Sequence, residues 1–295
     1  MRVDSVLPGR LPVFSFEFFP PRSDEGVRQL FETIAHLREL EPTFVSVTYG
    51  AGGSVRIRTV ELVARIRKEL DIEPVAHLTC AGATVPELLD IIDGLRAAGI
   101  DNILALRGDP PDGVASFPVA DGGLAHGNEL MQLIRDRSGL CVGGACYPEK
   151  HLESRNFDDE LRYTRLKVDS GASYLITQLF FENQSYFDFV ARARAAGVTV
   201  PIVPGIMPVT NVEQIQRFTS KIGATIPLAL LEALRARADD PEAVLQLGVA
   251  WSTLQCAELL AGGAPGIHFY TLNRSPATRA ILSALRAARP WERLR

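Results

Sequence analysis

The 295-residue sequence is poor in the residues that build metal centres and disulfides. It holds four cysteines and five histidines, and neither set shows a CxxC, HxH or HExxH spacing. Zinc ligands usually come at such spacings, so the pattern disfavours a zinc or iron site. We therefore expect no metal. We interpret the cysteines, two of which lie in the apolar run CVGGACY (141–147), as reduced packing residues.

Long apolar runs and clusters of one charge sign are also missing. No stretch approaches the roughly 18 uninterrupted apolar residues of a membrane span, and the start MRVDSVLPGRLPVF lacks the apolar core of a signal peptide. The net charge is −4, and the basic residues form no run of the kind that binds phosphate backbones. We expect a soluble, cytoplasmic protein with no membrane or nucleic-acid partner.

A complete nucleotide fingerprint is absent as well. The nearest candidate, GAGGSV (50–55), lies between a predicted strand and a predicted helix, but Val55 stands where the last glycine belongs, and no Walker lysine is present. An open, doubly wound dinucleotide domain is therefore disfavoured. We interpret this segment as a flexible loop near a ligand.

What the sequence does have is regular alternation of strand and helix patterns over its whole length. Apolar residues make up 46% of it, which allows a large core. The predicted strands are Val13–Phe18, Phe44–Thr48, Pro74–Thr79, Asn102–Leu106, Leu140–Cys146, Tyr174–Gln178, Pro201–Ile206 and Gly266–Tyr270. The predicted helices include Gly26–Leu40, Val55–Leu70, Pro86–Ala98, Asn183–Ala196, Pro227–Ala238 and Glu242–Gly262.

Eight βα units without an internal boundary predict an α/β fold of the (β/α)8 TIM-barrel class. We expect one catalytic domain over residues 1–295, with extra helices between strands seven and eight. The glycines of AAG (97–99), DSG (169–171) and AAG (195–197) each follow a predicted helix, where a left-handed residue is common.

Barrel enzymes place their chemistry at the C-terminal ends of the strands. In this sequence those ends carry mostly polar side chains, which predicts a site on one rim. The residues are Glu17, Thr48, His77, Arg107 with Asp109, Tyr147, Gln178, Met207 with Pro208, and Tyr270.

Glu17 is the sharpest candidate. The period of two along the first strand puts Val13, Ser15 and Glu17 on one face and three phenylalanines on the other. The phenylalanines suit a helix-packed outer face, so we predict that Glu17 points into the barrel. Loss of hydration there would raise its pKa and make it a general acid. A structural ion pair with an arginine or lysine is the alternative.

Other candidates remain open on the residues alone. Asp109 could stabilise a developing cation, or Asp-Pro-Pro could be a rigid turn. His77 and His151 could equally be core histidines. Lys167 lies inside a predicted helix, which disfavours a Schiff-base aldolase. Arg274 lies where a following helix begins, a place that suits anionic ligand groups.

Together these segments resemble the bacterial methylenetetrahydrofolate reductases, from about residue 12 to about residue 288. The resemblance rests on SFEFFPPR (15–22), SVTYGAGG (46–53), HLTC (77–80), ALRGDPP (105–111), YPEKH (147–151), KVDSGA (167–172), ITQLFF (176–181), PGIMPVTN (204–211) and HFYTLNR (268–274).

The resemblance implies a β/α barrel that binds FAD and works by a ping-pong reaction. NADH or NADPH would reduce the flavin, which would then reduce methylenetetrahydrofolate to methyltetrahydrofolate. Glu17 matches the family's general acid and Asp109 the carboxylate that binds the pterin. Further matches to folate contacts are Gln178, Phe218, Tyr270 and Arg274.

The positions that match flavin contacts are Thr48, His77, Arg107, Gly108, Asp109, His126, Ala145, Tyr147, His151, Glu160, Lys167 and Tyr270. The chain departs from the family on the adenosine side. It has His126-Gly127 where a Tyr-Ala pair is expected, and Tyr163 where Asn or Leu is common.

The resemblance also implies a homo-oligomer and no C-terminal regulatory domain, so inhibition by adenosylmethionine is not expected. NADH and NADPH are not distinguished. The alternative is a flavin-free or non-redox pterin- or folate-binding barrel.

Overall fold

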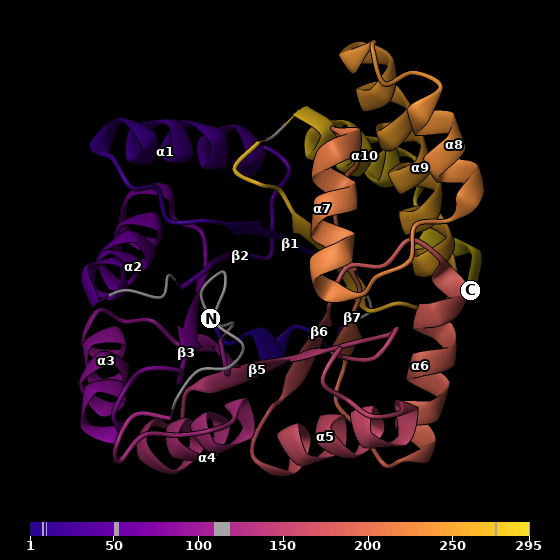
Figure 1. Ribbon diagram of the computed structural model, residues 1–295. Helices are drawn as coiled ribbons and strands as arrows, with labels where there is room; N and C mark the ends of the chain where they lie inside the picture. The colour runs from indigo at the N-terminus through magenta and orange to yellow at the C-terminus, as the bar shows by residue number, and fades with distance from the viewer. Residues whose placement is uncertain (8, 10, 50–52, 109–118, 275, 295) are drawn as a thin grey trace.

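Parallel strands form one sheet around the centre of the molecule, and helices lie outside it (Figure 1). The computed structural model describes residues 1–295 except 8, 10, 50–52, 109–118, 275 and 295, and the side chains of 53–58 and 293–294 are not described. The strands are β1 (Val13–Phe18), β2 (Phe44–Val47), β3 (Pro74–Thr79), β4 (Asn102–Leu106), β5 (Cys141–Cys146), β6 (Tyr174–Thr177), β7 (Ile202–Val203), β8 (Gly205–Ile206) and β9 (Gly266–Tyr270).

The barrel closes through a strand that is broken at Pro204. β7 pairs with β6, and β8 pairs with β9, all in parallel. The sequence predicted one strand over Pro201–Ile206. Pro204 has no N–H to donate to a ladder, although its carbonyl still accepts from the amide of His268 at 2.9 Å. The predicted eight-stranded barrel is therefore confirmed, with its seventh strand in two short pieces.

The helices include all six for which a range was predicted, each close to that range. They are α1 (Asp24–Arg38), α2 (Gly53–Arg65), α3 (Val85–Ala97), α4 (Gly127–Ser138), α5 (Phe157–Asp169), α6 (Asn183–Ala195), α7 (Val212–Ile222), α8 (Leu228–Arg235), α9 (Pro241–Ala261) and α10 (Pro276–Ala288). Short helical turns cover η1 (Val3–Ser5), η2 (Ile66–Leu70), which continues α2 with π geometry, and η3 (Pro290–Leu294). Gly99, Gly171 and Gly197 have φ of 75°, 121° and 84°, the left-handed conformation predicted for them.

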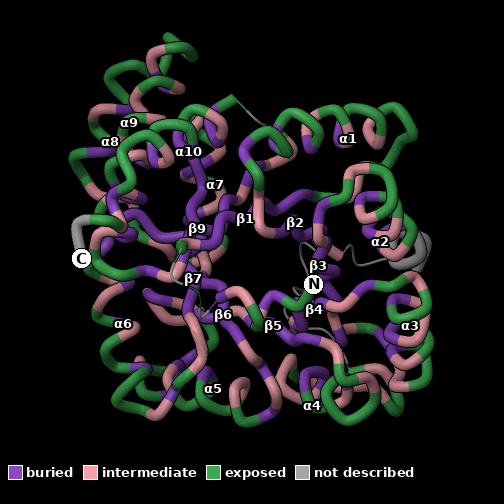
Figure 2. The backbone as a smooth tube through the Cα atoms, turned by 180° about the vertical axis from the view of Figure 1, so that it is seen from behind, coloured by how far each residue is buried: buried purple, intermediate pink, exposed green. Residues whose placement is uncertain are grey.

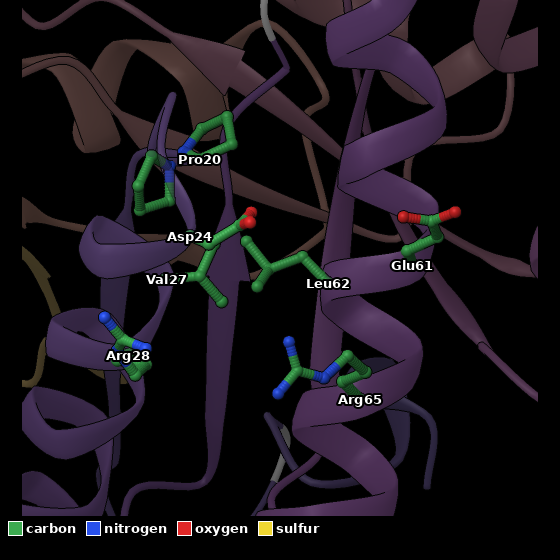
Figure 3. Close-up of a pocket in the computed structure, with 8 residues that line it drawn as sticks. Pro20, Asp24, Val27, Arg28, Glu61, Leu62 and Arg65 are labelled. Atoms are coloured by element: carbon green, nitrogen blue, oxygen red, sulfur yellow. The ribbon is translucent and has the colours of Figure 1, made fainter.

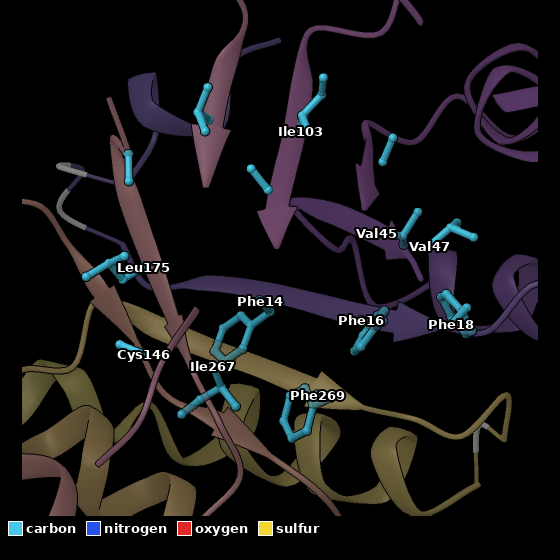
Figure 4. Packing of buried hydrophobic residues seen from close by; sticks show 14 of the residues in the cluster. Phe14, Phe16, Phe18, Val45, Val47, Ile103, Cys146, Leu175, Ile267 and Phe269 are labelled. Atoms are coloured by element: carbon cyan, nitrogen blue, oxygen red, sulfur yellow. The ribbon is translucent and has the colours of Figure 1, made fainter. Parts of the chain in front are cut away.

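Apolar residues fill two separate layers, one outside the sheet and one inside it. Phe14, Phe16 and Phe18 face outward and pack with the helices, as the alternation of β1 predicts (Figure 4). The cluster inside the barrel includes Val13, and it is closed at the N-terminal end of the strands by Val3 and Leu7. Figure 2 shows the same division, with buried strands at the centre and exposed outer helix faces.

The two extra helices predicted between the last two strands of the barrel are α8 and α9, and they stand with α7 at one side (Figure 1). They share an apolar cluster that includes Met207, Ile215, Leu234 and Val244. By length and composition alone, α9 is the one helix of the described residues that could cross a membrane. In this fold it packs against α6, α10, η3 and β9.

Candidate active site

Glu17 lies at the C-terminal end of β1 with its side chain inside the barrel. Only 8% of the residue is exposed. Its Oε2 atom lies 3.3 Å from Nε2 of His268 on β9 and 3.4 Å from Nε2 of His77 on β3. Among the described residues, no lysine or arginine forms the ion pair considered as an alternative for this carboxylate, which faces two imidazoles instead.

These neighbours change the expected ionisation of Glu17. Burial alone would raise its pKa, but the imidazoles of His77 and His268 outweigh burial, and the pKa of Glu17 lies below its ordinary value. The sequence-based expectation of a raised pKa is thus wrong for the ligand-free protein. Burial lowers the pKa of His77 to about 4, so this ring is neutral at neutral pH. At neutral pH the Glu17 carboxylate is therefore stabilised by its contact with His268.

His268 connects Glu17 to the barrel interior. Its Nδ1 lies 2.8 Å from the hydroxyl oxygen of Ser15, and its Nε2 is the atom that faces Glu17. One tautomer satisfies both contacts, with Ser15 donating to Nδ1 and Nε2 donating to the carboxylate. We assigned no role to Ser15 or His268 from the sequence. The signal was present, because each lies two residues from a predicted site residue on the same strand face.

The loop after β9 fixes the end of β1. The Thr271 hydroxyl donates to the carbonyl of Glu17 at 2.6 Å. The side-chain oxygen of Asn273 accepts from the amide of Phe19, and its nitrogen donates to the carbonyl of Phe19, at 2.8 and 2.9 Å. Asn273 has a φ of 58°, a conformation that asparagine tolerates. The loop after β9 therefore holds the backbone on and just after Glu17.

Tyr270 lies across the barrel beside this cluster. Its hydroxyl donates to the carbonyl of Thr177 on β6 at 2.6 Å, and burial raises its pKa well above the ordinary value. The hydroxyl is thus engaged within the protein, while the ring packs with the same cluster as Phe218 on α7. Two of the predicted folate contacts thus pack against one apolar cluster.

A second group of predicted residues gathers at the ends of β5 and α5. The Lys167 ammonium donates to the carbonyl of Ala145 at 2.8 Å and lies 5.3 Å from the ring centre of Tyr147. Desolvation by burial lowers the pKa of Lys167. His151 packs edge-on against Tyr147, and burial lowers its pKa too.

The carboxylate of Glu160 binds the loop that carries His151. It accepts from the amide of His151 at 3.0 Å and from the hydroxyls of Ser154 and Thr164 at 2.9 and 3.3 Å. These contacts anchor the loop to the first turns of α5.

Arg107 extends this group from the end of β4. Both of its terminal nitrogens donate to Glu153, at 2.6 and 2.8 Å. Gly127 packs closely against the backbone of Arg107. A Cβ on residue 127 would lie 3.1 Å from the backbone nitrogen of Arg107. This close approach explains a glycine at 127 and places the exposed His126, which precedes α4, near the same rim. Gly108, with a φ of 94°, turns the chain away from the strand.

The remaining predicted residues are more scattered. Thr48 follows β2, where its amide donates to the carbonyl of Phe18 at 2.8 Å. The Gln178 side chain accepts from the amide of Leu179, and Gln178 lines a small recess with Tyr147. Arg274 is exposed on the loop after β9.

Two predicted features lie outside the described residues. Asp109 is one, and the glycine-rich segment at 50–52 is the other.

Two polar atoms at the rim are buried without a hydrogen bond to any residue that the structure describes. They are the Ser46 hydroxyl and Nε2 of His77, whose 3.4 Å approach to Glu17 is not aligned as a hydrogen bond. Ser46 is the parallel-strand partner of Glu17. Orphaned polar groups of this kind are costly in an empty core and suit a site that receives a polar ligand.

A hollow of about 280 Å³ lies elsewhere, between α1 and α2 (Figure 3). Charged residues of both helices line it, among them Asp24, Arg28, Glu61 and Arg65. None of the predicted site residues lines it. Among the described residues, no three His, Cys, Asp or Glu side chains are arranged to hold a metal ion. The four cysteines are buried free thiols, and burial raises the pKa of Cys80 to about 11.

Comparison with known proteins places the chain in one family. The family model for methylenetetrahydrofolate reductase matches residues 2–286. The chain is 36% identical to 5,10-methylenetetrahydrofolate reductase of Escherichia coli, covering 92% of this chain and 90% of that protein. It is also 36% identical to methylenetetrahydrofolate reductase (NADH) 1 of Arabidopsis thaliana, over 99% of this chain. It spans about half the length of that plant relative, 52%.

Solved structures with a similar fold include pterin- and folate-binding barrels. An uncharacterised protein from Clostridium thermocellum that binds two copies of 5-methyltetrahydrofolic acid superposes with a TM-score of 0.66, at 18% identity and 97% and 98% coverage of the two chains. Dihydropteroate synthase from Xanthomonas albilineans gives 0.54 at 12% identity, with 94% and 93% coverage. At these identities the likeness concerns the fold alone.

Proposed function

The chain belongs to the methylenetetrahydrofolate reductase family, and on that premise we propose that it reduces 5,10-methylenetetrahydrofolate to 5-methyltetrahydrofolate with a bound flavin and a reduced nicotinamide cofactor. One observation carries the proposal. A carboxylate, Glu17, faces two imidazoles at the C-terminal rim of the barrel, where such folds perform their chemistry.

The residues at the rim fit a flavin dinucleotide. The unpartnered Nε2 of His77 and the hydroxyl of Ser46 are available to a polar ring, and the guanidinium of Arg107 and the ammonium of Lys167 suit its phosphates. Tyr147 and His151 add aromatic surface beside them. When bound, a flavin would supply the hydride chemistry between the nicotinamide and the folate.

The protein itself supplies the proton donor, which is the carboxyl group of Glu17. In this proposal Glu17 donates a proton to the bridge nitrogen of the folate, which opens the five-membered ring to an electrophilic iminium. A pterin ring that covers the rim removes the remaining water from Glu17, and this desolvation opposes the effect of His268 on its pKa.

The other polar residues bind and orient the substrate. Gln178 and the ring faces of Phe218 and Tyr270 would contact the pterin and the aromatic part of the folate. Arg274, which is exposed beside the rim, would bind the glutamate tail. Asp109 would bind the pterin. For the electron donor, the Arabidopsis relative carries NADH in its name, so we propose NADH as the preferred cofactor.

A visible spectrum and an anaerobic titration test this proposal. The protein, purified and then mixed with FAD, should show a flavin spectrum that NADH bleaches and that methylenetetrahydrofolate restores. A protein that binds methyltetrahydrofolate but stays colourless with added FAD, and consumes no NADH or NADPH, would instead be a non-redox folate-binding barrel.

A further inference from the structure

Glu153 forms an ion pair with the guanidinium of Arg107, a cationic group that the phosphates of the proposed cofactor need. The pair is bidentate, with contacts of 2.6 and 2.8 Å, so both terminal nitrogens of the guanidinium face the carboxylate. The Arg107 side chain is 31% exposed and that of Glu153 is 60% exposed. Such exposed pairs contribute little to stability and can exchange with other anions.

Glu153 is held in place independently of Arg107. Its amide donates to Nδ1 of His151 at 3.1 Å. On its other side, the carbonyl of Ser154 accepts from the Lys150 ammonium at 2.9 Å, and the Ser154 hydroxyl donates to Glu160. The loop therefore presents the Glu153 carboxylate to Arg107 without needing this ion pair to keep its shape.

The charges around the pair favour a more highly charged anion. Arg107 and Lys167 lie within electrostatic reach of one another, and Glu160 is engaged by its loop contacts. A pyrophosphate carries more negative charge than one carboxylate and has the oxygens to bind a guanidinium fork. It can thus take the place of Glu153 at Arg107.

We propose that Glu153 is an internal competitor for the phosphate groups of the flavin, holding Arg107 until the cofactor displaces it. This inference rests on the proposed flavin-dependent function. It makes Glu153 a positioning residue that weakens cofactor binding and keeps Arg107 ordered when the cofactor is absent.

Flavin titrations of the apoprotein test the inference, with Glu153→Gln as the variant and flavin fluorescence as the readout. The variant should bind FAD about twofold to fivefold more tightly than the parent protein, the range expected for loss of one exposed ion pair. Its affinity for riboflavin, which has no phosphate, should not change. Glu69→Gln is the matched control, since Glu69 forms a comparable two-contact pair with Arg65 at the end of α2; it should change neither affinity.

A second variant makes the result specific to Arg107. In an Arg107→Ala background, Glu153→Gln should give no gain in FAD affinity, because the competition needs both partners. An unchanged or weaker FAD affinity of the single variant, or an equal gain for riboflavin, would overturn the inference while leaving the flavin proposal intact. If the parent protein binds no FAD at all, the flavin proposal itself fails, and the inference with it.

Discussion

Gly205 on β8 and Tyr270 at the end of β9 lie against each other inside the barrel. A Cβ atom on Gly205 would lie 2.6 Å from Cε2 of the Tyr270 ring and 2.3 Å from the Thr177 carbonyl that this tyrosine binds. The ring keeps its place at the rim because residue 205 has no side chain. Both residues thus shape the proposed folate site.

We expect Gly205→Ala to displace the Tyr270 ring. Overpacking at such a site costs about 1–3 kcal/mol, so urea unfolding should show a loss of this size, with a higher KM for methylenetetrahydrofolate. Gly94→Ala in α3 is the control, because a Cβ there meets nothing within 4 Å. It should stabilise the protein by up to about 1 kcal/mol and leave KM unchanged. A stable Gly205→Ala variant with a normal KM would argue against this arrangement.

The buried His77 predicts that stability falls as the pH is lowered. Its pKa is about 4 in the folded protein and near the ordinary histidine value of 6.5 when unfolded. The unfolded state therefore binds a proton first, and the free energy of unfolding should drop as the pH falls from 6.5 towards 4. The full drop is about 3 kcal/mol. Glu17 titrates in a lower pH range. Because its pKa is lowered in the folded protein, its contribution to the free energy of unfolding is lost only as the pH falls below 4.5, the pKa of the unfolded glutamate.

Urea unfolding of the apoprotein between pH 6.5 and pH 5 tests the His77 contribution when the parent protein is compared with a variant, because burial lowers the pKa of His151 too. A His77→Asn variant cannot titrate, so its free energy of unfolding should change less over this range than that of the parent protein. Parallel pH profiles for the two proteins would show that His77 is not the group responsible.

Arg274 is proposed to bind the glutamate tail of the folate without touching the reacting atoms. Arg274→Ala should therefore raise the folate KM roughly tenfold, the effect of losing a charge-assisted hydrogen bond, and leave kcat within about twofold. Arg137→Ala, which removes an exposed cation on α4 paired with Asp93, should change neither value. An unchanged KM for Arg274→Ala contradicts the assignment.

Local patterns predicted the barrel and the direction in which Glu17 points. The alternation along β1 is a property of the backbone, so the inward face could be read from the residues, and the left-handed glycines likewise follow from helix ends. The break at Pro204 could also have been expected from its missing N–H, although the strand was predicted as continuous.

The ionisation of Glu17 and the partner of Arg107 could not be predicted in the same way. His77 lies 60 residues from Glu17 in the chain and His268 lies 251 residues away, so only the closed barrel brings their rings to the carboxylate. We considered burial alone and therefore expected the wrong direction of the pKa shift. Glu153 is 46 residues from Arg107 and lies in a loop without a motif of its own.

The most direct test of the account is to measure the two half-reactions separately for Glu17→Gln. Glutamine keeps the size of the side chain and a hydrogen-bonding group near His268, but it cannot deliver a proton. Stopped-flow mixing of the FAD-loaded variant with NADH should give a rate close to that of the parent protein, whereas methylenetetrahydrofolate reduction should slow by about 10²- to 10⁴-fold. An equal loss in both half-reactions, or an undiminished rate of folate reduction, would contradict the role of Glu17 as the proton donor.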